Sequence, residues 1–259
     1  MHRMTGEESS CSERAAALLA AAVEAFFEAG FCTGEFAEAR RLAEEAGARA
    51  AGDDDRVGAV RASILLGYVV HYQNIAGVID GREADPAEVA KEEALFLEGL
   101  AICERLGDEV GMARAEFGLG LVEQVLRHDW EASLPHYLRA QELTPALEAV
   151  GDLYMLSEID RHLGFHLAFA ATEPAKAVAR LNRSLELRER LGDRRVIPSG
   201  LEGLAWVEQE AGNLRRAVEL LRRTITLGRE VGLLPVRIER TAQTLQEAEA
   251  ALAARALEA

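Results

Sequence analysis

Aromatic residues are scarce in this sequence. Phe, Trp and Tyr make up 5% of its 259 residues, whereas hydrophobic residues as a whole reach 49%. A core built from such a chain depends on small and aliphatic side chains, above all Ala and Leu, which favour helices and let them approach closely. The length is enough for one large domain or two smaller ones.

Cysteine is scarce as well. Cys11, Cys32 and Cys103 are the three present, and they form no Cys-x-x-Cys motif. A small and odd number of cysteines argues against a disulfide framework and favours a reducing compartment, so we expect a cytoplasmic protein. The apolar stretch 15–31 contains Glu24 and Glu28. It therefore predicts a helix of a soluble domain rather than a signal peptide or a membrane span.

Positive charge is in deficit. The chain has 29 Lys and Arg against 44 Asp and Glu, a formal net charge of −15. An acidic surface repels the phosphates of nucleic acids and the headgroups of anionic membranes, so neither is expected as a direct partner. The simplest role of the acidity is to keep an Ala-rich protein soluble.

Sequence motifs of common catalytic sites are absent too. The chain contains no Gly-x-Gly-x-x-Gly, no Gly-x-x-x-x-Gly-Lys-Ser/Thr and no Gly-x-Ser-x-Gly. Nothing therefore points to a bound dinucleotide, a bound nucleoside triphosphate or an esterase nucleophile. We expect a protein without enzymatic activity and without a cofactor.

What the sequence does contain is a repeated Gly-Asp pair. The motif ERLGD occurs at 104–108 and at 189–193, and the variants RAAGD and EAVGD occur at 49–53 and 148–152. Gly suits the left-handed position that ends a helix, and Asp suits the start of the next helix. From the second motif onward the glycines recur every 40–44 residues, and the last of them is Gly232.

A second marker keeps step with the first. Leu119–Gly120, Leu163–Gly164 and Leu204–Ala205 each end 13 residues after a Gly of the preceding motif, and Leu66–Gly67 ends 15 residues after Gly52. Small and large residues alternate at helical spacing in the runs that follow. These positions are Ser133, Tyr137 and Ala140; Ala177, Leu181 and Ser184; and Ala217, Leu221 and Thr224.

These two markers resemble those of tetratricopeptide (TPR) repeats, in the long-repeat variety similar to kinesin light chains and to the TPR arms of bacterial regulators. The resemblance implies an all-α fold, a right-handed α-α superhelix of five helix pairs with a C-terminal capping helix. We expect a flexible N-terminus and a single solenoid domain. The boundaries are 1–11 for the flexible segment, 12–259 for the domain, 12–52, 53–107, 108–151, 152–192 and 193–232 for the units, and 233–259 for the cap.

The resemblance also implies a function, namely binding of a protein or peptide in the concave groove that the first helices line, in a regulatory or scaffolding role. Aromatic area beside Arg side chains would suit an extended or helical peptide that carries a carboxylate. The alternative is that the same aromatic residues pack between neighbouring helices. The predicted groove residues are Arg61, Tyr68, His71, Tyr72, Arg114, Phe117, Gln124, Arg161, Phe165, Phe169, Trp206 and Gln209.

Two further hypotheses stay open. Glu158, His162 and His166 share one helical face, and with His71 they could form a metal-dependent or small-ligand enzyme in the groove. Glu123 and Glu208, at corresponding positions of two units, could provide acid–base groups. The other hypothesis is self-association into a homo-oligomer through the closing helix or an open end of the superhelix. The basic pairs Arg215–Arg216 and Arg222–Arg223 receive no role.

Overall fold

The computed structural model describes residues 6–79 and 83–258, and it describes side chains within 13–76 and 83–256. All secondary structure in these ranges is helical. The chain divides into two compact units. The first unit comprises residues up to Ala146 without Phe31–Thr33, and the second comprises Phe31–Thr33 and residues from Leu147 onward.

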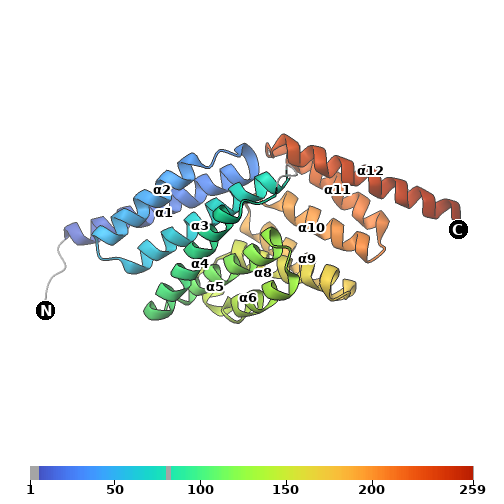
Figure 1. Cartoon of the computed structure of the whole chain (residues 1–259). Coiled ribbons are helices and arrows are strands. Elements are labelled where there is room, and N and C mark those ends of the chain that lie inside the picture. Colours follow the sequence, from blue (N-terminus) through green and yellow to red (C-terminus); the bar gives the residue numbers. More distant parts are fainter. Residues whose placement is uncertain (1–5, 80–82, 259) are drawn as a thin grey trace. The chain divides into compact units, whose positions relative to one another are not determined.

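The first unit is a row of helices in which each packs on the next. Figure 1 shows its first four helices side by side. The odd-numbered helices also contact one another in turn, so the row repeats the same two-helix unit. The helices are α1 (Gly6–Glu28), α2 (Ala37–Gly52), α3 (Arg56–Ile79), α4 (Pro86–Leu106), α5 (Glu109–Leu121) and α6 (Trp130–Glu142).

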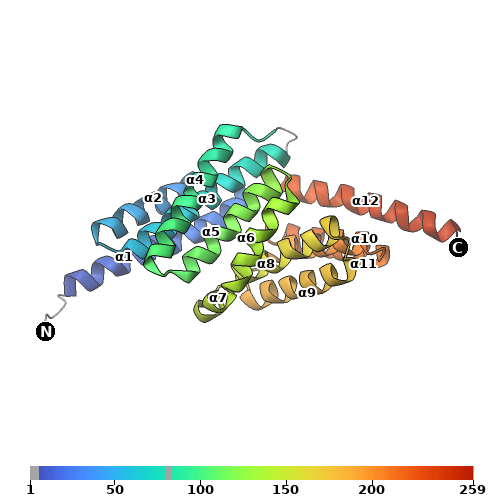
Figure 2. The same cartoon turned by 60° about the horizontal axis from the view of Figure 1, so that its bottom comes forward.

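The second unit repeats this arrangement (Figure 2). The short helix α7 (Thr144–Val150) contains the boundary between the units. In the rest of the second unit each helix packs on the next, and α8 also contacts α10. These helices are α8 (Leu153–Phe165), α9 (Pro174–Leu191), α10 (Ile197–Glu210), α11 (Leu214–Glu230) and α12 (Pro235–Glu258).

Within the described residues, the predicted all-α fold of five helix pairs and one closing helix is confirmed. The separate helix α7 was not predicted. Pro145 has no N–H to donate to the carbonyl of Gln141; the Oγ1 hydroxyl of Thr144 donates to that carbonyl at 2.8 Å. Of the predicted flexible segment, residues 1–5 lie outside the described ones, and residues 6–11 belong to α1.

The repeated Leu-Gly pairs, the second marker of the sequence, have a direct structural reason. Gly67, Gly120 and Gly164 each face a large side chain of the following helix, and a Cβ atom at these positions would collide with Phe96, Tyr137 and Leu181 respectively. At Gly67 the collision would leave 2.7 Å between the Cβ and Cε1 of Phe96. The missing side chain therefore lets the two helices of a pair approach closely.

The Gly-Asp motifs behave as predicted only in part. Gly52 belongs to α2 and has no left-handed φ, which Asp54 takes instead at 58°. Asp193 binds Arg195 and does not cap α10, which begins after Val196. Gly107 and Gly192 end α4 and α9 in the left-handed conformation, with φ of 69° and 79°. Asp152 starts α8 and accepts a hydrogen bond from the N–H of Met155 at 3.0 Å. The markers thus set the helix boundaries on which the first helices of the pairs depend.

Three first helices end in a π-helical turn, α1 in η1 (Ala29–Thr33), α5 in η2 (Val122–Leu126) and α8 in η3 (His166–Ala170). The chain then leaves η2 and η3 through a non-glycine residue with positive φ, His128 at 57° and Thr172 at 53°. A π-helical turn changes the direction in which the last side chains of a helix point, and such turns are frequent at functional sites. Gln124 and Phe169, both predicted groove residues, lie in these turns.

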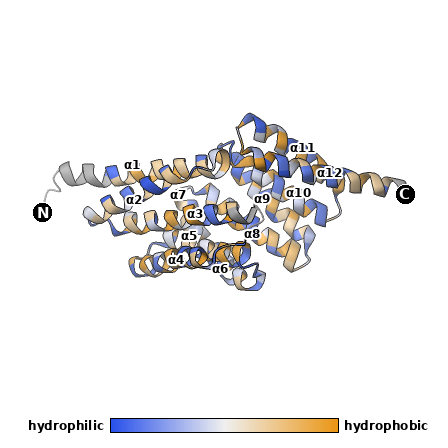
Figure 3. Ribbon diagram, turned by 45° about the horizontal axis from the view of Figure 1, so that its top comes forward, coloured by the Kyte–Doolittle hydropathy of each residue, from blue (hydrophilic) through white to orange (hydrophobic). Residues whose placement is uncertain are grey.

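Helix α1 contains most of an apolar stretch that continues into η1. The stretch Glu13–Thr33 has a mean hydropathy of 1.6. By length and composition alone it could cross a membrane. Figure 3 shows hydrophobic residues along much of this helix. Core helices pass the same test of length and composition. In the structure α1 packs against α2 and α3.

Close helix contact at the marker glycines predicts the effect of adding one methyl group. Gly120→Ala places a Cβ against the ring of Tyr137, and we expect it to lower the free energy of unfolding by about 1–3 kcal/mol. Urea unfolding followed by circular dichroism measures this change.

Gly52→Ala is the matched control. Gly52 ends α2, and a Cβ atom added there would have no other atom within 4 Å, so the gain in helix propensity should leave the protein equally stable or more stable. If Gly120→Ala proves as harmless as Gly52→Ala, the steric explanation of the marker is wrong.

Candidate functional site

In the first unit, the predicted groove residue Arg61 is paired with Asp108. Its Nε and Nη2 donate to the two carboxylate oxygens at 2.9 and 2.6 Å. Burial raises the pKa of Asp108, but the hydrogen bond and positive charge of Arg61 outweigh burial, and the pKa lies below its ordinary value. The pair joins α3 to the start of α5, so it has a structural role.

His71, another predicted groove residue, is buried between α3 and α4. Its Nδ1 lies 2.6 Å from Oε1 of Glu92, and the Nδ2 of Asn74 donates to Oε2 of the same carboxylate at 2.9 Å. Both His71 and Glu92 are buried, at 1% and 0% exposure. The imidazole is therefore part of an interhelical polar contact and has no access to a peptide on the surface.

Aromatic side chains of the first unit lie mostly in its interior. Tyr68 donates its hydroxyl to the carbonyl of Arg114 at 2.6 Å, and its ring centroid lies 5.1 Å from that of Phe96. Phe117 is 1% exposed and lies 5.5 Å from the ring of Tyr137. In this unit, packing between helices, which the sequence left as the alternative, accounts for Tyr68 and Phe117.

Three other predicted residues complete the first unit. Gln124 is buried in η2 and its Oε1 accepts a hydrogen bond from the hydroxyl of Tyr137 at 3.0 Å. Tyr72 packs edge-on against Phe26 at 5.0 Å. Tyr72 and the side chain of Arg114 are half-buried, so they keep some surface for a partner.

The second unit brings four predicted residues together. Phe165, at the end of α8, lies 5.9 Å from the ring of Phe169 and 6.0 Å from that of Trp206 on α10. The guanidinium of Arg161 lies over the Phe165 ring, 4.7 Å from its centroid. We call Arg161, Phe165, Phe169 and Trp206 the Phe165 cluster.

Part of the Phe165 cluster is open to solvent. Phe169 is 41% exposed and is one of few large hydrophobic side chains in the described residues with such exposure. Trp206 is half-buried, as is Gln209 one turn further along α10. Gly203 makes the arrangement possible, because a Cβ there would lie 3.0 Å from Cζ of Phe165 and 3.2 Å from Nε of Arg161.

Glu158, one helical turn before Arg161 on α8, belongs to a buried ion pair that was not predicted from the sequence. Arg188 on α9 is 1% exposed and donates from Nη2 to Oε1 of Glu158. Its Nη1 donates to the carbonyl of Val196 and to Oγ of Ser199, both at 2.7 Å. Arg188 immediately precedes the second ERLGD motif, in a stretch whose many charged residues are typical of an exposed helix face. Its burial follows from contacts with other helices, which the sequence alone does not show.

The ion pair also bears on the metal hypothesis. Glu158 is engaged by Arg188, and its Oε2 lies 3.9 Å from Nε2 of His162. His166 is half-buried in η3, and its Nδ1 has no hydrogen-bond partner in the described part of the chain. The described residues contain no group of three His, Cys, Asp or Glu side chains that could hold a metal ion.

The two glutamates considered for acid–base work both have partners. Glu123 accepts a hydrogen bond from Arg127 at 2.5 Å, and Glu208 accepts one from Nδ2 of Asn213 at 2.7 Å. They belong to different units. Local contacts thus account for each of them.

The comparison with solved structures finds chains of similar fold. The chain resembles BtubC (BKLC) from P. vanneervenii, with 19% sequence identity and a TM-score of 0.52 over 87% of this chain and 89% of that one. At this identity the similarity shows a shared fold. No protein-family model matches the chain, and no curated protein matches it in sequence. The structure and the comparison together show an all-helical, helical-repeat-like protein.

The Arg61–Asp108 pair predicts a pH-dependent contribution to stability. A carboxyl whose pKa is lowered in the folded state stabilises the fold at pH values above its unfolded pKa, about 3.9. This stabilisation is lost as the pH falls through the folded pKa. Arg61→Met should therefore lower the free energy of unfolding by about 1–2 kcal/mol at pH 7 and by progressively less below about pH 4.

Urea unfolding at a series of pH values measures the cost of Arg61→Met. Arg56→Met is the control, because Arg56 and Asp54 are 76% and 93% exposed and lie 3.8 Å apart, so little change is expected at any pH. An Arg61→Met penalty that stays constant from pH 7 to the acid limit would contradict the assignment.

The buried Glu158–Arg188 pair predicts strong coupling between the two residues. Arg188→Met removes the nearer of the two cations of Glu158, since Arg161 Nη1 lies 3.9 Å from its Oε2, and should lower the free energy of unfolding by about 3–5 kcal/mol. Adding Glu158→Leu should recover part of this loss, because no charge is then left unpaired. A double variant as unstable as the sum of the single ones would show that the pair is not coupled.

Proposed function

We propose that the chain is a TPR-like module of the long-repeat variety that binds a protein or peptide, has no chemistry of its own and acts as a regulatory or scaffolding component of the cytoplasm. The Phe165 cluster is the observation that carries this proposal. Free thiols at Cys32 and Cys103 are consistent with a reducing compartment.

The cluster has the features of a peptide-binding hot spot. Aromatic and Arg side chains supply a disproportionate share of the binding energy in protein interfaces. Phe169 offers exposed apolar area, and Trp206 and Gln209 border it with half-buried side chains. Phe165 packs against both Trp206 of α10 and the guanidinium of Arg161. These contacts hold its ring in place before a partner arrives, which reduces the entropic cost of binding.

The chemistry of the cluster favours one kind of partner. An aliphatic or aromatic side chain of a peptide would cover Phe169, and a carboxylate beside it would meet the guanidinium of Arg161. Because the chain carries a net charge of −15, a strongly acidic partner would be repelled at long range. We therefore expect a mainly apolar peptide segment with one acidic group next to its anchor side chain.

Selection from a random peptide display library on the intact chain, followed by affinity measurement, tests this function. Selected peptides should bind Phe169→Ala at least about tenfold more weakly, because truncation of a hot-spot aromatic residue typically costs this much or more. Gln209→Ala should weaken the same peptides by a smaller factor. Circular dichroism should show unchanged helicity for both variants.

Leu138→Ala is the matched control for exposed apolar area. Leu138 is 45% exposed and lies on α6 in the first unit, so its loss should leave peptide affinity unchanged. The proposal is wrong if no peptide is enriched, or if the enriched peptides bind Phe169→Ala as tightly as the unaltered chain.

A further inference from the structure

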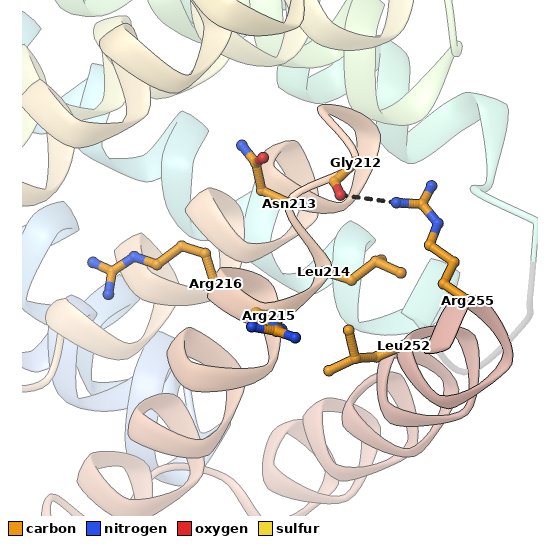
Figure 4. Close-up of a pocket in the computed structure, with 7 residues that line it drawn as sticks. All are labelled: Gly212, Asn213, Leu214, Arg215, Arg216, Leu252 and Arg255. Carbon is orange, nitrogen blue, oxygen red and sulfur yellow. Dashed lines mark hydrogen bonds between the residues drawn. The ribbon is translucent and has the colours of Figure 1, made fainter. Parts of the chain in front are cut away.

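A second feature of the same unit lies where α11 begins beside the last turns of α12. A pocket of about 420 Å³ lies there. Figure 4 shows its lining residues, which are Gly212, Asn213, Leu214, Arg215, Arg216, Leu252 and Arg255. It is formed by the turn between α10 and α11 together with α12. Its size falls within the range of pockets that hold small organic ligands.

The charge of this pocket is opposite to that of the protein. Three of the seven lining residues are Arg and none is acidic, although the chain has 44 acidic residues and 29 basic ones. An acidic side chain outside the pocket neutralises one of the three, since Arg216 lies 3.2 Å from Glu219. Figure 4 shows Arg216 extending away from the two leucines.

The other two arginines keep their charge available. Arg255 crosses from α12 and donates from Nη1 to the carbonyl of Gly212 at 3.0 Å, which leaves its remaining N–H groups for a ligand. Arg215 is exposed and makes no hydrogen bond or ion pair with any described residue. The positive end of the α11 helix dipole adds potential of the same sign.

The wall between these cations is apolar. Leu214 is 8% exposed and Leu252 is half-buried, and Figure 4 shows their side chains next to each other beside Arg215 and Arg255. Apolar surface next to fixed guanidinium groups suits a molecule with a hydrocarbon part and one anionic end. Arg binds carboxylates with two parallel hydrogen bonds, which fixes the orientation of such an end.

We infer that this pocket binds a small amphiphilic carboxylate, with the aliphatic chain against Leu214 and Leu252 and the carboxylate between Arg215 and Arg255. A nucleic acid is a poorer occupant, because its many phosphates would meet the net charge of −15 beyond the pocket. Inorganic phosphate is poorer as well, because it leaves the leucines uncovered. The inference does not depend on peptide binding at the Phe165 cluster.

Titration calorimetry of the full chain with octanoate tests the site. Octanoate should bind with a Kd of about 1 mM or tighter, the range that ligand efficiency allows for a molecule of this size. Octanol, which has the same chain without the charge, should bind at least about tenfold more weakly. Octanoate binding should also weaken as the salt concentration rises, because both cations are exposed.

Substitutions assign the binding to the pocket. Arg215→Gln and Arg255→Gln should each weaken octanoate binding about tenfold. Arg222→Gln is the control, because Arg222 lies on the same helix, pairs with Glu249 at 2.6 Å and does not line the pocket. The inference is overturned if octanoate does not bind, if octanol binds equally well, or if Arg222→Gln weakens octanoate as much as the pocket variants do.

Discussion

The fold depends on the contact between a small residue in the first helix of a pair and a large one in the second. Gly67 meets Phe96, Gly120 meets Tyr137, and Gly164 meets Leu181. The chain has few aromatic residues, and in each of these pairs one large side chain of the second helix lies against a glycine of the first. Because the glycine has no side chain, the two helices can pack closely along their length. Ala and Leu fill the remaining core positions around each of these contacts.

The same contacts determine which side chains of the first helices stay exposed to solvent. Once each pair is closed, most aromatic residues of the first unit are covered, and Arg61 and His71 are held by Asp108 and Glu92. In the second unit, η3 turns the end of α8 so that Phe169 stays exposed beside Phe165. The candidate site therefore arises where a first helix departs from regular α-helical geometry.

Much of the fold could be predicted from the sequence, because its markers are local. A glycine that ends a helix, as at Gly107, and an Asp that starts one, as at Asp152, act through their own backbone neighbourhood. The candidate site could be predicted only in part. The helical periodicity places Phe117 and Phe169 on equivalent helix faces, but their exposures differ. Phe117 is 1% exposed because neighbouring helices cover it, whereas Phe169 is 41% exposed in the π-helical turn η3. Arg188 could not be recognised as buried, since Glu158 and Ser199 are remote in sequence.

A double-mutant cycle at Gly164 and Leu181 tests the central packing claim most directly. Gly164→Ala in the unaltered chain should be destabilising, because its Cβ collides with Leu181. In a Leu181→Ala background the same change should cost little or nothing, since the added methyl group enters the space that Leu181 vacates. The account predicts a coupling energy of about 1–3 kcal/mol between the two positions. Additive effects of the two substitutions would contradict it.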